Sequence, residues 1–239
     1  MRQAGRYLPS YQALRKKHTL WELFHSPTLA AQVTHLPFEV LPLDAAILFS
    51  DILVIAEVFG YDLTFPEGKG PVLLPPLETT QLPVAETLSY VFETIRLLKP
   101  TLKVPLIGFC GGPYTVASYM MGKQQLTDPA ALHLLLEKLT AASIEYLQLQ
   151  IQAGVDAIQI FDSWAGLLPP PLFNEFSLKY LKQIIEKITV PVIISAVEAT
   201  GMIMRGETER ITFPLAVLVT FSIVYLSACY MVIDYVVEE

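Results

Sequence analysis

Cysteine is scarce in this chain: its 239 residues include only Cys110 and Cys229. Two cysteines cannot build a disulfide framework or a four-cysteine zinc site, and they favour a reducing compartment. Charged residues are also scarce, at 16%, and no basic stretch offsets the formal net charge of −7. This pattern argues against a nucleic-acid partner. We expect no signal peptide, since the first thirty residues carry charges and no long apolar run.

Several common site motifs are missing as well. No GxGxxG or GxxxxGK[ST] pattern follows a predicted strand, so a nucleotide-binding sheet has no support. The four histidines show neither HxH nor HExxH spacing, and we therefore expect no metal site. No nucleophile elbow and no clear Ser/His/Asp set is present.

Hydrophobic residues are abundant, at 53% of the chain, which excludes intrinsic disorder. They are concentrated in the uncharged run 211–233, which is long enough to cross a membrane as a helix. Its many β-branched residues also fit a buried segment or translated non-coding sequence. We therefore expect a body over 1–194 and an unrelated tail over 195–239, with a possible transmembrane helix at 211–233.

Short apolar runs alternate with amphipathic stretches throughout the body. The apolar runs predict strands at 44–48, 104–109, 156–161 and 191–195. Periodicity and capping residues predict helices from Ser26-Pro27 to about 36, over 88–98, from 127–129 to Gly154, and over about 173–187. This alternation indicates βαβ units and a parallel sheet that is covered on both faces. A doubly wound sheet and a (β/α) barrel both fit.

Candidate site residues follow the predicted strands, where parallel α/β folds place their ligands. Asp51 lies in an apolar neighbourhood and is either a functional acid, a helix cap or half of an ion pair. Tyr119 follows the glycine pair Gly111-Gly112 and, taken alone, fits a packed tyrosine. Ser163 ends the third strand and, taken alone, fits a cap.

Arg2 and Arg6 stand four residues apart near the start of the sequence. On a helix they would share one face and could hold carboxylates in forked geometry. A solvated pair of terminal charges is the alternative.

Six segments, in this order along the chain, resemble the uroporphyrinogen decarboxylase family. They are MRQAGRYLP (1–9), PLDAAILFSDILVI (42–55), GKGP (68–71), PLIGFCGGPYTVASYM (105–120), AGVDAIQIFDSWAG (153–166) and FNEFSLKYLKQI (173–184). Long motifs in the family's order are a specific match, and together they cover about residues 1–194.

The resemblance implies a (β/α)₈ TIM barrel with its cleft at the carboxyl ends of the strands. It also implies decarboxylation of the four acetate side chains of uroporphyrinogen to give coproporphyrinogen, without a cofactor, in porphyrin (haem and chlorophyll) biosynthesis. By the same resemblance, Arg2 and Arg6 hold substrate carboxylates, Asp51 faces the pyrrole N–H groups, and Tyr119 and Ser163 hydrogen-bond the acid side chains. The catalytic set implied is Asp51, Arg6 and Tyr119.

The chain also departs from the family pattern. It begins at the arginine motif, has only a short link at 121–125, and shows no counterpart of the family's late histidine after Ser195. We therefore expect a truncated or aberrant form whose barrel is incomplete, with a foreign apolar tail and uncertain catalytic competence. The family implies a homodimer in the cytoplasm, with a plastid or a membrane anchored through 211–233 as alternatives.

Two other functions are weighed against the decarboxylase. One is a non-catalytic, tail-anchored isoform that binds porphyrinogen or a full-length subunit. The other is a corrinoid-related methyltransferase, whose barrel is similar. Those methyltransferases carry zinc on His and Cys, and Cys110 has no His-x-Cys partner.

Overall fold

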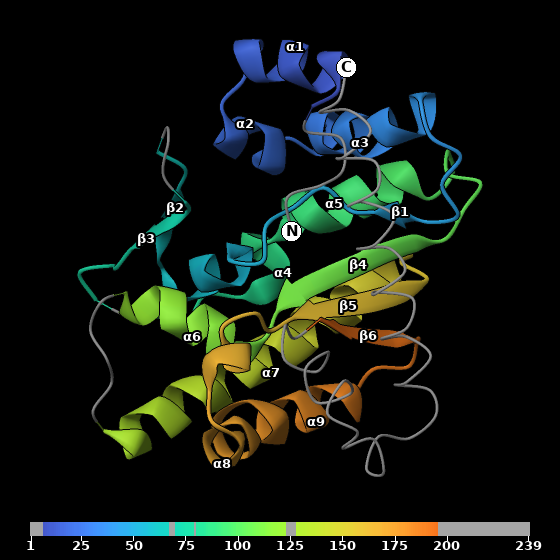
Figure 1. Cartoon of the computed structure of the whole chain (residues 1–239). Coiled ribbons are helices and arrows are strands. Elements are labelled where there is room, and N and C mark those ends of the chain that lie inside the picture. The colour runs from blue at the N-terminus through green and yellow to red at the C-terminus, as the bar shows by residue number, and fades with distance from the viewer. Residues whose placement is uncertain (1–6, 67–69, 79, 123–127, 196–239) are drawn as a thin grey trace, which may run out of the picture.

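A parallel four-stranded sheet forms the centre of the protein in the computed structural model, which describes residues 7–66, 70–78, 80–122 and 128–195 (Figure 1). Its order is β1-β4-β5-β6, and each neighbouring pair is parallel. The strands are β1 (Ala46–Ile47), β4 (Leu106–Gly111), β5 (Ala157–Phe161) and β6 (Val192–Ser195). All four coincide with the predicted apolar runs to within about two residues at each end.

The first predicted helix precedes β1, and the other three predicted helical segments connect the strands in order. They are α3 (Pro27–His35), α5 (Ser89–Leu98), α7 (Pro129–Ala153) and a final helical path made of α8 (Pro170–Phe173), the π-helical turn η4 (Asn174–Leu178) and α9 (Lys179–Ile185). Helices α3, α5, α7 and α9 pack against one another in sequence, following the order of the strands. This succession of βα units is the predicted (β/α)-barrel arrangement, and the described residues contain four strands of its sheet.

The ends of the helices agree with their expected caps, with one exception. Asp128 accepts a hydrogen bond from the Ala130 N–H at the start of α7, and Gly154 ends that helix at φ +122°. Ser26 precedes α3 as expected, but its hydroxyl makes no capping bond and lies 3.2 Å from the Thr28 hydroxyl.

Several short elements were not predicted. They are α1 (Pro9–Lys17), α2 (Leu20–His25), α4 (Val84–Thr87), α6 (Pro113–Met121), the 3₁₀ helices η1 (Leu36–Glu39), η2 (Val54–Phe59) and η3 (Ala165–Leu167), and the antiparallel hairpin of β2 (Asp62–Thr64) and β3 (Val72–Leu74). The GKGP segment lies between β2 and β3, and its residues 68 and 69 are outside the described residues.

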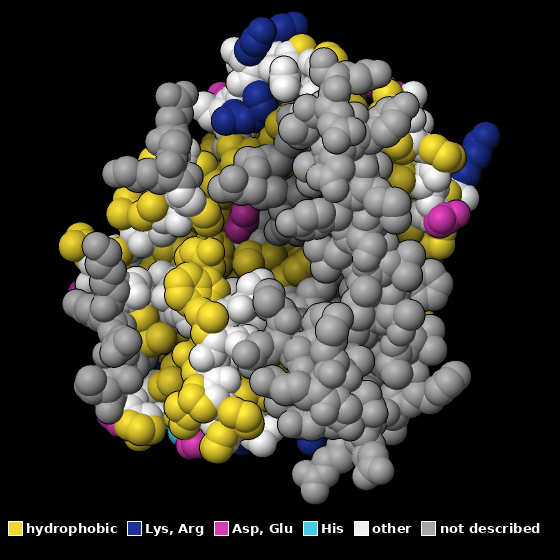
Figure 2. All heavy atoms as spheres, in the orientation of Figure 1, with side chains coloured by type: hydrophobic (Ala, Val, Ile, Leu, Met, Phe, Trp, Pro, Cys, Tyr) yellow, Lys and Arg dark blue, Asp and Glu magenta, His cyan; other side chains and the backbone are white. Residues whose placement is uncertain are grey.

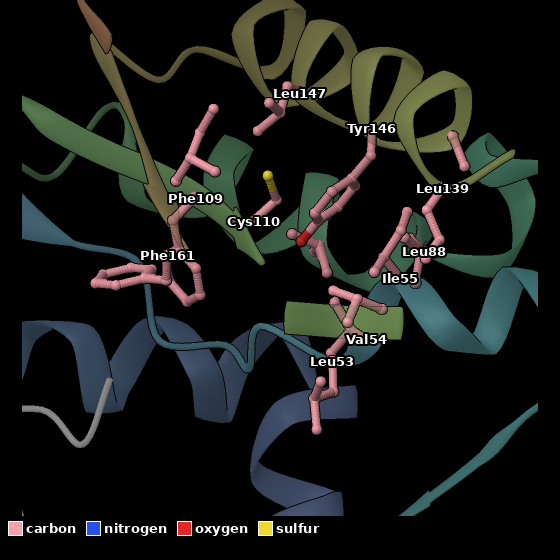
Figure 3. Packing of buried hydrophobic residues seen from close by; sticks show 14 of the residues in the cluster. Leu53, Val54, Ile55, Leu88, Phe109, Cys110, Leu139, Tyr146, Leu147 and Phe161 are labelled. Atoms are coloured by element: carbon pink, nitrogen blue, oxygen red, sulfur yellow. The ribbon is translucent and has the colours of Figure 1, made fainter. Parts of the chain in front are cut away.

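The main core lies between the sheet and the helical layer. Side chains of α7, β4 and η2 meet there, with the Tyr146 ring pointing inward from α7 toward Cys110 on β4 (Figure 3). A smaller core joins α1, α2 and α3 and includes Tyr11, Phe24 and Phe49. Since Phe49 follows β1, this second core packs α1–α3 beside the loop that carries Asp51.

Two expectations concern residues outside those described. Arg2 and Arg6 precede residue 7, and the proposed tail 195–239 is described only at Ser195. None of the described helices is long and apolar enough to cross a membrane.

Candidate functional site

Three of the five predicted site residues lie at one edge of the sheet. Because β1, β4, β5 and β6 are parallel, their carboxyl ends share an edge. Asp51 follows β1, Tyr119 lies on α6 directly after β4, and Ser163 follows β5. Arg2 and Arg6 lie outside the described residues. Figure 2 shows an acidic group in a hollow on this face of the molecule, and many of the described side chains near it are hydrophobic.

The adjacent glycines at the end of β4 allow this convergence. A Cβ on Gly111 would lie 2.8 Å from the Ile52 carbonyl oxygen, next to Asp51. A Cβ on Gly112 would collide with the Asp162 carboxylate, next to Ser163. The glycine pair therefore lets the loop after β1 and the end of β5 approach β4 from both sides. The sequence pattern alone gave this pair little weight.

The Asp51 carboxylate is held by the backbone. Its Oδ1 accepts a hydrogen bond of 2.9 Å from the Leu53 N–H, and the side chain is partly exposed. No Lys, Arg or His among the described residues forms an ion pair with it. Burial raises the pKa of Asp51, the Leu53 N–H opposes this, and the charge of Glu57 adds to the rise. Within the described residues neither alternative is seen: the bond that Asp51 accepts closes a turn two residues ahead, and no cation there pairs with its carboxylate.

Tyr119 takes part in an aromatic pair with Trp164, the residue after Ser163. Its ring lies edge-on to Trp164, with centroids 5.7 Å apart at 79°. The ring also packs against the main core, as the alternative of a packed tyrosine expects, and its hydroxyl has no hydrogen-bond partner among the described residues.

Ser163 is exposed in the turn after β5. Its hydroxyl has no hydrogen-bond partner among residues 7–66, 70–78, 80–122 and 128–195, so the capping alternative finds no support there. Trp164 follows it, and its backbone N–H donates to the Thr115 hydroxyl at 3.0 Å. Through Trp164, the position of Ser163 is tied to α6 and to Tyr119.

Sequence reasoning missed Asp162, the buried acid that organises this edge. Its carboxylate accepts hydrogen bonds from the Thr115 N–H at 3.1 Å, from the Thr115 hydroxyl at 2.8 Å and from the Ser177 hydroxyl. The carboxylate caps the N-terminus of α6, a place that favours a negative charge. Burial nevertheless raises the pKa of Asp162 against these three bonds. Its place directly after an apolar strand was the only signal in the sequence.

No group of three or more His, Cys, Asp or Glu side chains within the described part of the chain could hold a metal ion. The chemistry available there consists of one partly exposed carboxylate, two hydroxyls and an aromatic pair.

Residues 1–213 match the family described as Uroporphyrinogen decarboxylase (URO-D). The chain is 47% identical over 214 residues to the uroporphyrinogen decarboxylase of Protochlamydia amoebophila, covering 81% of this chain and 59% of the relative. It is 45% identical over 217 residues to that of Desulfotalea psychrophila, covering 82% and 64%. The chain thus spans about three fifths of the length of these curated relatives.

A solved structure, a methyltransferase from Methanosarcina mazei, superposes with a TM-score of 0.65 at 23% identity, covering 77% of this chain and 60% of the other. At this identity the likeness concerns the fold, and it supports the (β/α)-barrel assignment.

Proposed function

The chain belongs to the uroporphyrinogen decarboxylase family, and we propose from this membership that it acts in removing carboxyl groups from the acetate arms of uroporphyrinogen. The observation that carries the proposal is the Asp51 carboxylate, which stands at the carboxyl edge of the sheet without a cation partner among the described residues.

The chemistry needs an electron sink. Protonation of a pyrrole ring makes that ring cationic, and the bond between the acetate methylene and its carboxylate can then break. The electron pair of this bond neutralises the ring, carbon dioxide leaves, and a second proton converts the methylene to a methyl group as the first is returned. A fixed carboxylate beside the pyrrole N–H groups stabilises the cation, most strongly where water is excluded.

The environment of Asp51 suits this role. Burial favours its neutral form in the free protein, so the carboxylate gains most when a cation forms beside it. The pyrrole N–H groups would donate to the carboxylate, and the Tyr119 and Ser163 hydroxyls would donate to the acid side chains. Arg2 and Arg6 would hold further carboxylates, and Arg6 would take part in turnover. Local arginines are needed because the net charge of −7 repels a polyanion.

Replacing Asp51 by Asn tests the assignment. Asp51→Asn keeps the size of the side chain but removes its charge, so we expect kcat to fall by about 10²- to 10³-fold with most porphyrin binding retained. Anaerobic assays with uroporphyrinogen, with products separated by chromatography, would measure it. Asp44→Asn, the same change at an exposed position before β1, is the matched control. Unchanged turnover in Asp51→Asn, beside an active wild type, would refute the role.

We further propose a cytoplasmic homodimer, in which residues 1–194 form the barrel segment and 195–239 a separate tail. The free, buried Cys110 thiol supports a reducing compartment. Membrane insertion through 211–233, in a tail-anchored binding isoform, is the alternative to this arrangement.

A further inference from the structure

A second cluster of polar side chains lies behind the loop that carries Asp51. His25 Nε2 lies 3.1 Å and 3.3 Å from the two carboxylate oxygens of Glu57, and the Tyr90 hydroxyl donates to Glu57 Oε2 at 3.0 Å. The three residues come from α2, η2 and α5, so the cluster joins three elements that are distant in sequence. Neither the family resemblance nor the relatives described above assign a role to any of the three residues.

The cluster is sheltered and well ordered by its neighbours. The His25 and Glu57 side chains are each 15% exposed, and Tyr90 is 9% exposed. The His25 ring stacks on Trp21 with centroids 4.1 Å apart, and its Nδ1 lies 2.9 Å from the Trp21 carbonyl oxygen. Because that carbonyl can only accept, Nδ1 carries the proton. Nε2 can then also be protonated and donate to Glu57, which makes an ion pair.

Hydrogen bonds connect this cluster to Asp51. The Asp51 carboxylate accepts from the Leu53 N–H, and Leu53 is the N-cap residue directly before η2. Glu57 lies on the same short helix and is held from the other side by His25 and Tyr90. The position of the Asp51 carboxylate therefore depends on η2, whose own position depends on Glu57.

We propose that Glu57, held by His25 and Tyr90, is a positioning residue that fixes the Asp51 carboxylate through η2 and acts on it through its charge. The consequence for decarboxylation rests on the proposed function. The effect on Asp51 itself does not.

The charges of Glu57 and His25 determine the direction in which each should shift the pKa of Asp51. Glu57 raises the pKa of Asp51 by like-charge repulsion, in addition to burial. Burial opposes protonation of His25, but the hydrogen bond and charge of Glu57 outweigh it and the pKa of the imidazole is raised. Among the described residues, the Tyr90 and Tyr146 phenols also lie near the pair, and their pKa values are raised by burial first and then by nearby groups that include Glu57 and Asp51. Both phenols are therefore neutral, and His25 is the cation that offsets Glu57.

Two substitutions should consequently shift the pKa of Asp51 in opposite directions. Glu57→Gln removes the repelling charge, so the pKa of Asp51 falls and the acid limb of kcat/KM moves to lower pH. His25→Gln leaves Glu57 without its cation, so the pKa of Asp51 rises and the acid limb of kcat/KM moves to higher pH. We expect shifts on the order of 0.5 pH unit, as one nearby unit charge produces at a high effective dielectric constant.

Carbon-13 NMR of the Asp51 carboxyl group in the full 239-residue chain reads this titration directly, with the resonance identified by its loss in Asp51→Asn. The acid limb is measured separately with uroporphyrinogen. His35→Gln and Glu39→Gln, the same changes outside the cluster, should leave both readouts unmoved. His25→Lys, which retains a cation, should return the titration toward that of the wild type.

Shifts of opposite sign in the two variants support the proposal. Shifts of the same sign, or an Asp51 titration that moves in neither variant, overturn it, and so does a loss of activity that is uniform in pH and leaves the Asp51 titration unmoved. If the wild type fails to decarboxylate, the proposed function fails, and the NMR titration still decides the role of Glu57. If His25→Gln does not fold, a lower pKa of Asp51 in Glu57→Gln beside an unshifted titration in His25→Lys supports the proposal, and an unchanged or raised pKa in Glu57→Gln overturns it.

Discussion

At the scale of single residues, the site is decided by which of two neighbouring side chains turns inward after β5. Asp162 is fully buried, whereas Ser163 is exposed. The sequence places both at the carboxyl edge of the sheet, but the direction of each side chain depends on where the strand ends. Ser163 was predicted from the family resemblance, and nothing in the strand pattern separated it from Asp162 or placed Tyr119 against Trp164.

Asp162 makes stability depend on pH with a definite sign. Burial raises its pKa in the folded protein, so its contribution to stability is greatest below the pKa of an unfolded aspartate and is lost as pH rises through the folded value. In Asp162→Asn this contribution is absent, and the amide can still accept from Thr115 and donate to the Ser177 hydroxyl. We therefore expect the variant to gain stability relative to wild type as pH rises from about 4 toward neutrality.

Urea unfolding at a series of pH values measures the difference between the two proteins. Asp162→Ala, which leaves three donors without an acceptor, should instead lose about 1–3 kcal/mol or more of the free energy of unfolding at every pH. A difference between Asp162→Asn and wild type that is constant with pH would contradict the assigned pKa shift.

At the scale of secondary structure, α7 supplies the hydrogen bonds that β4 would otherwise lack, because its neighbour β1 is too short to pair with all of it. Strand β1 pairs with β4 only as far as Ile107, apart from one further bond from the Leu48 N–H. Beyond it, the Gln150 side chain accepts from the Phe109 N–H at 3.0 Å and donates to the Phe109 carbonyl at 3.0 Å. The amide of a helix side chain thus takes the place of the missing strand partner.

Gln150→Leu should be strongly destabilising. The leucine fills a similar volume, but the Phe109 N–H and carbonyl lose their partners in a buried region, at about 1–3 kcal/mol for each unsatisfied group. Chemical denaturation measures the loss. Gln148→Leu, the same change on the exposed face of α7, should change the free energy of unfolding by less than about 0.5 kcal/mol. Equal effects at the two positions would show that the Gln150 amide has no special role.

The long elements could be predicted from the sequence because their patterns are long. Apolar runs such as that of β4 and the stripe of α7 extend over enough residues to separate a strand from a helix. The three-residue strands of the β2–β3 hairpin, the six-residue η2 and the five-residue η4 are too short to show such a period. Their form is set by tertiary contacts, including the Ser177–Asp162 bond that holds η4.

At the scale of the whole molecule, one arrangement repeats: a strand, a helix that packs beside the preceding helix, and the next parallel strand (Figure 1). The alternation of patterns predicted this arrangement, while the choice between a barrel and a doubly wound sheet came from the family resemblance. Local periodicity says which elements form. It does not say on which face successive helices lie.

We expect the full chain to sediment as a dimer, at twice its mass of 26.6 kDa, in buffer without detergent. Analytical ultracentrifugation over a micromolar concentration series measures this. A single species at 26.6 kDa throughout would contradict the homodimer. Recovery only in detergent micelles would favour instead the alternative of a membrane-anchored tail.

The glycine pair at positions 111 and 112 has a consequence for how the family can vary. Neither position admits even the smallest side chain. Alanine at position 111 would clash with Ile52, and alanine at position 112 would clash with Asp162. A change at either position would need a simultaneous change in a neighbouring loop. In a library of single substitutions, function should therefore tolerate variation on the walls of the hollow far better than at the point where its three strand ends converge.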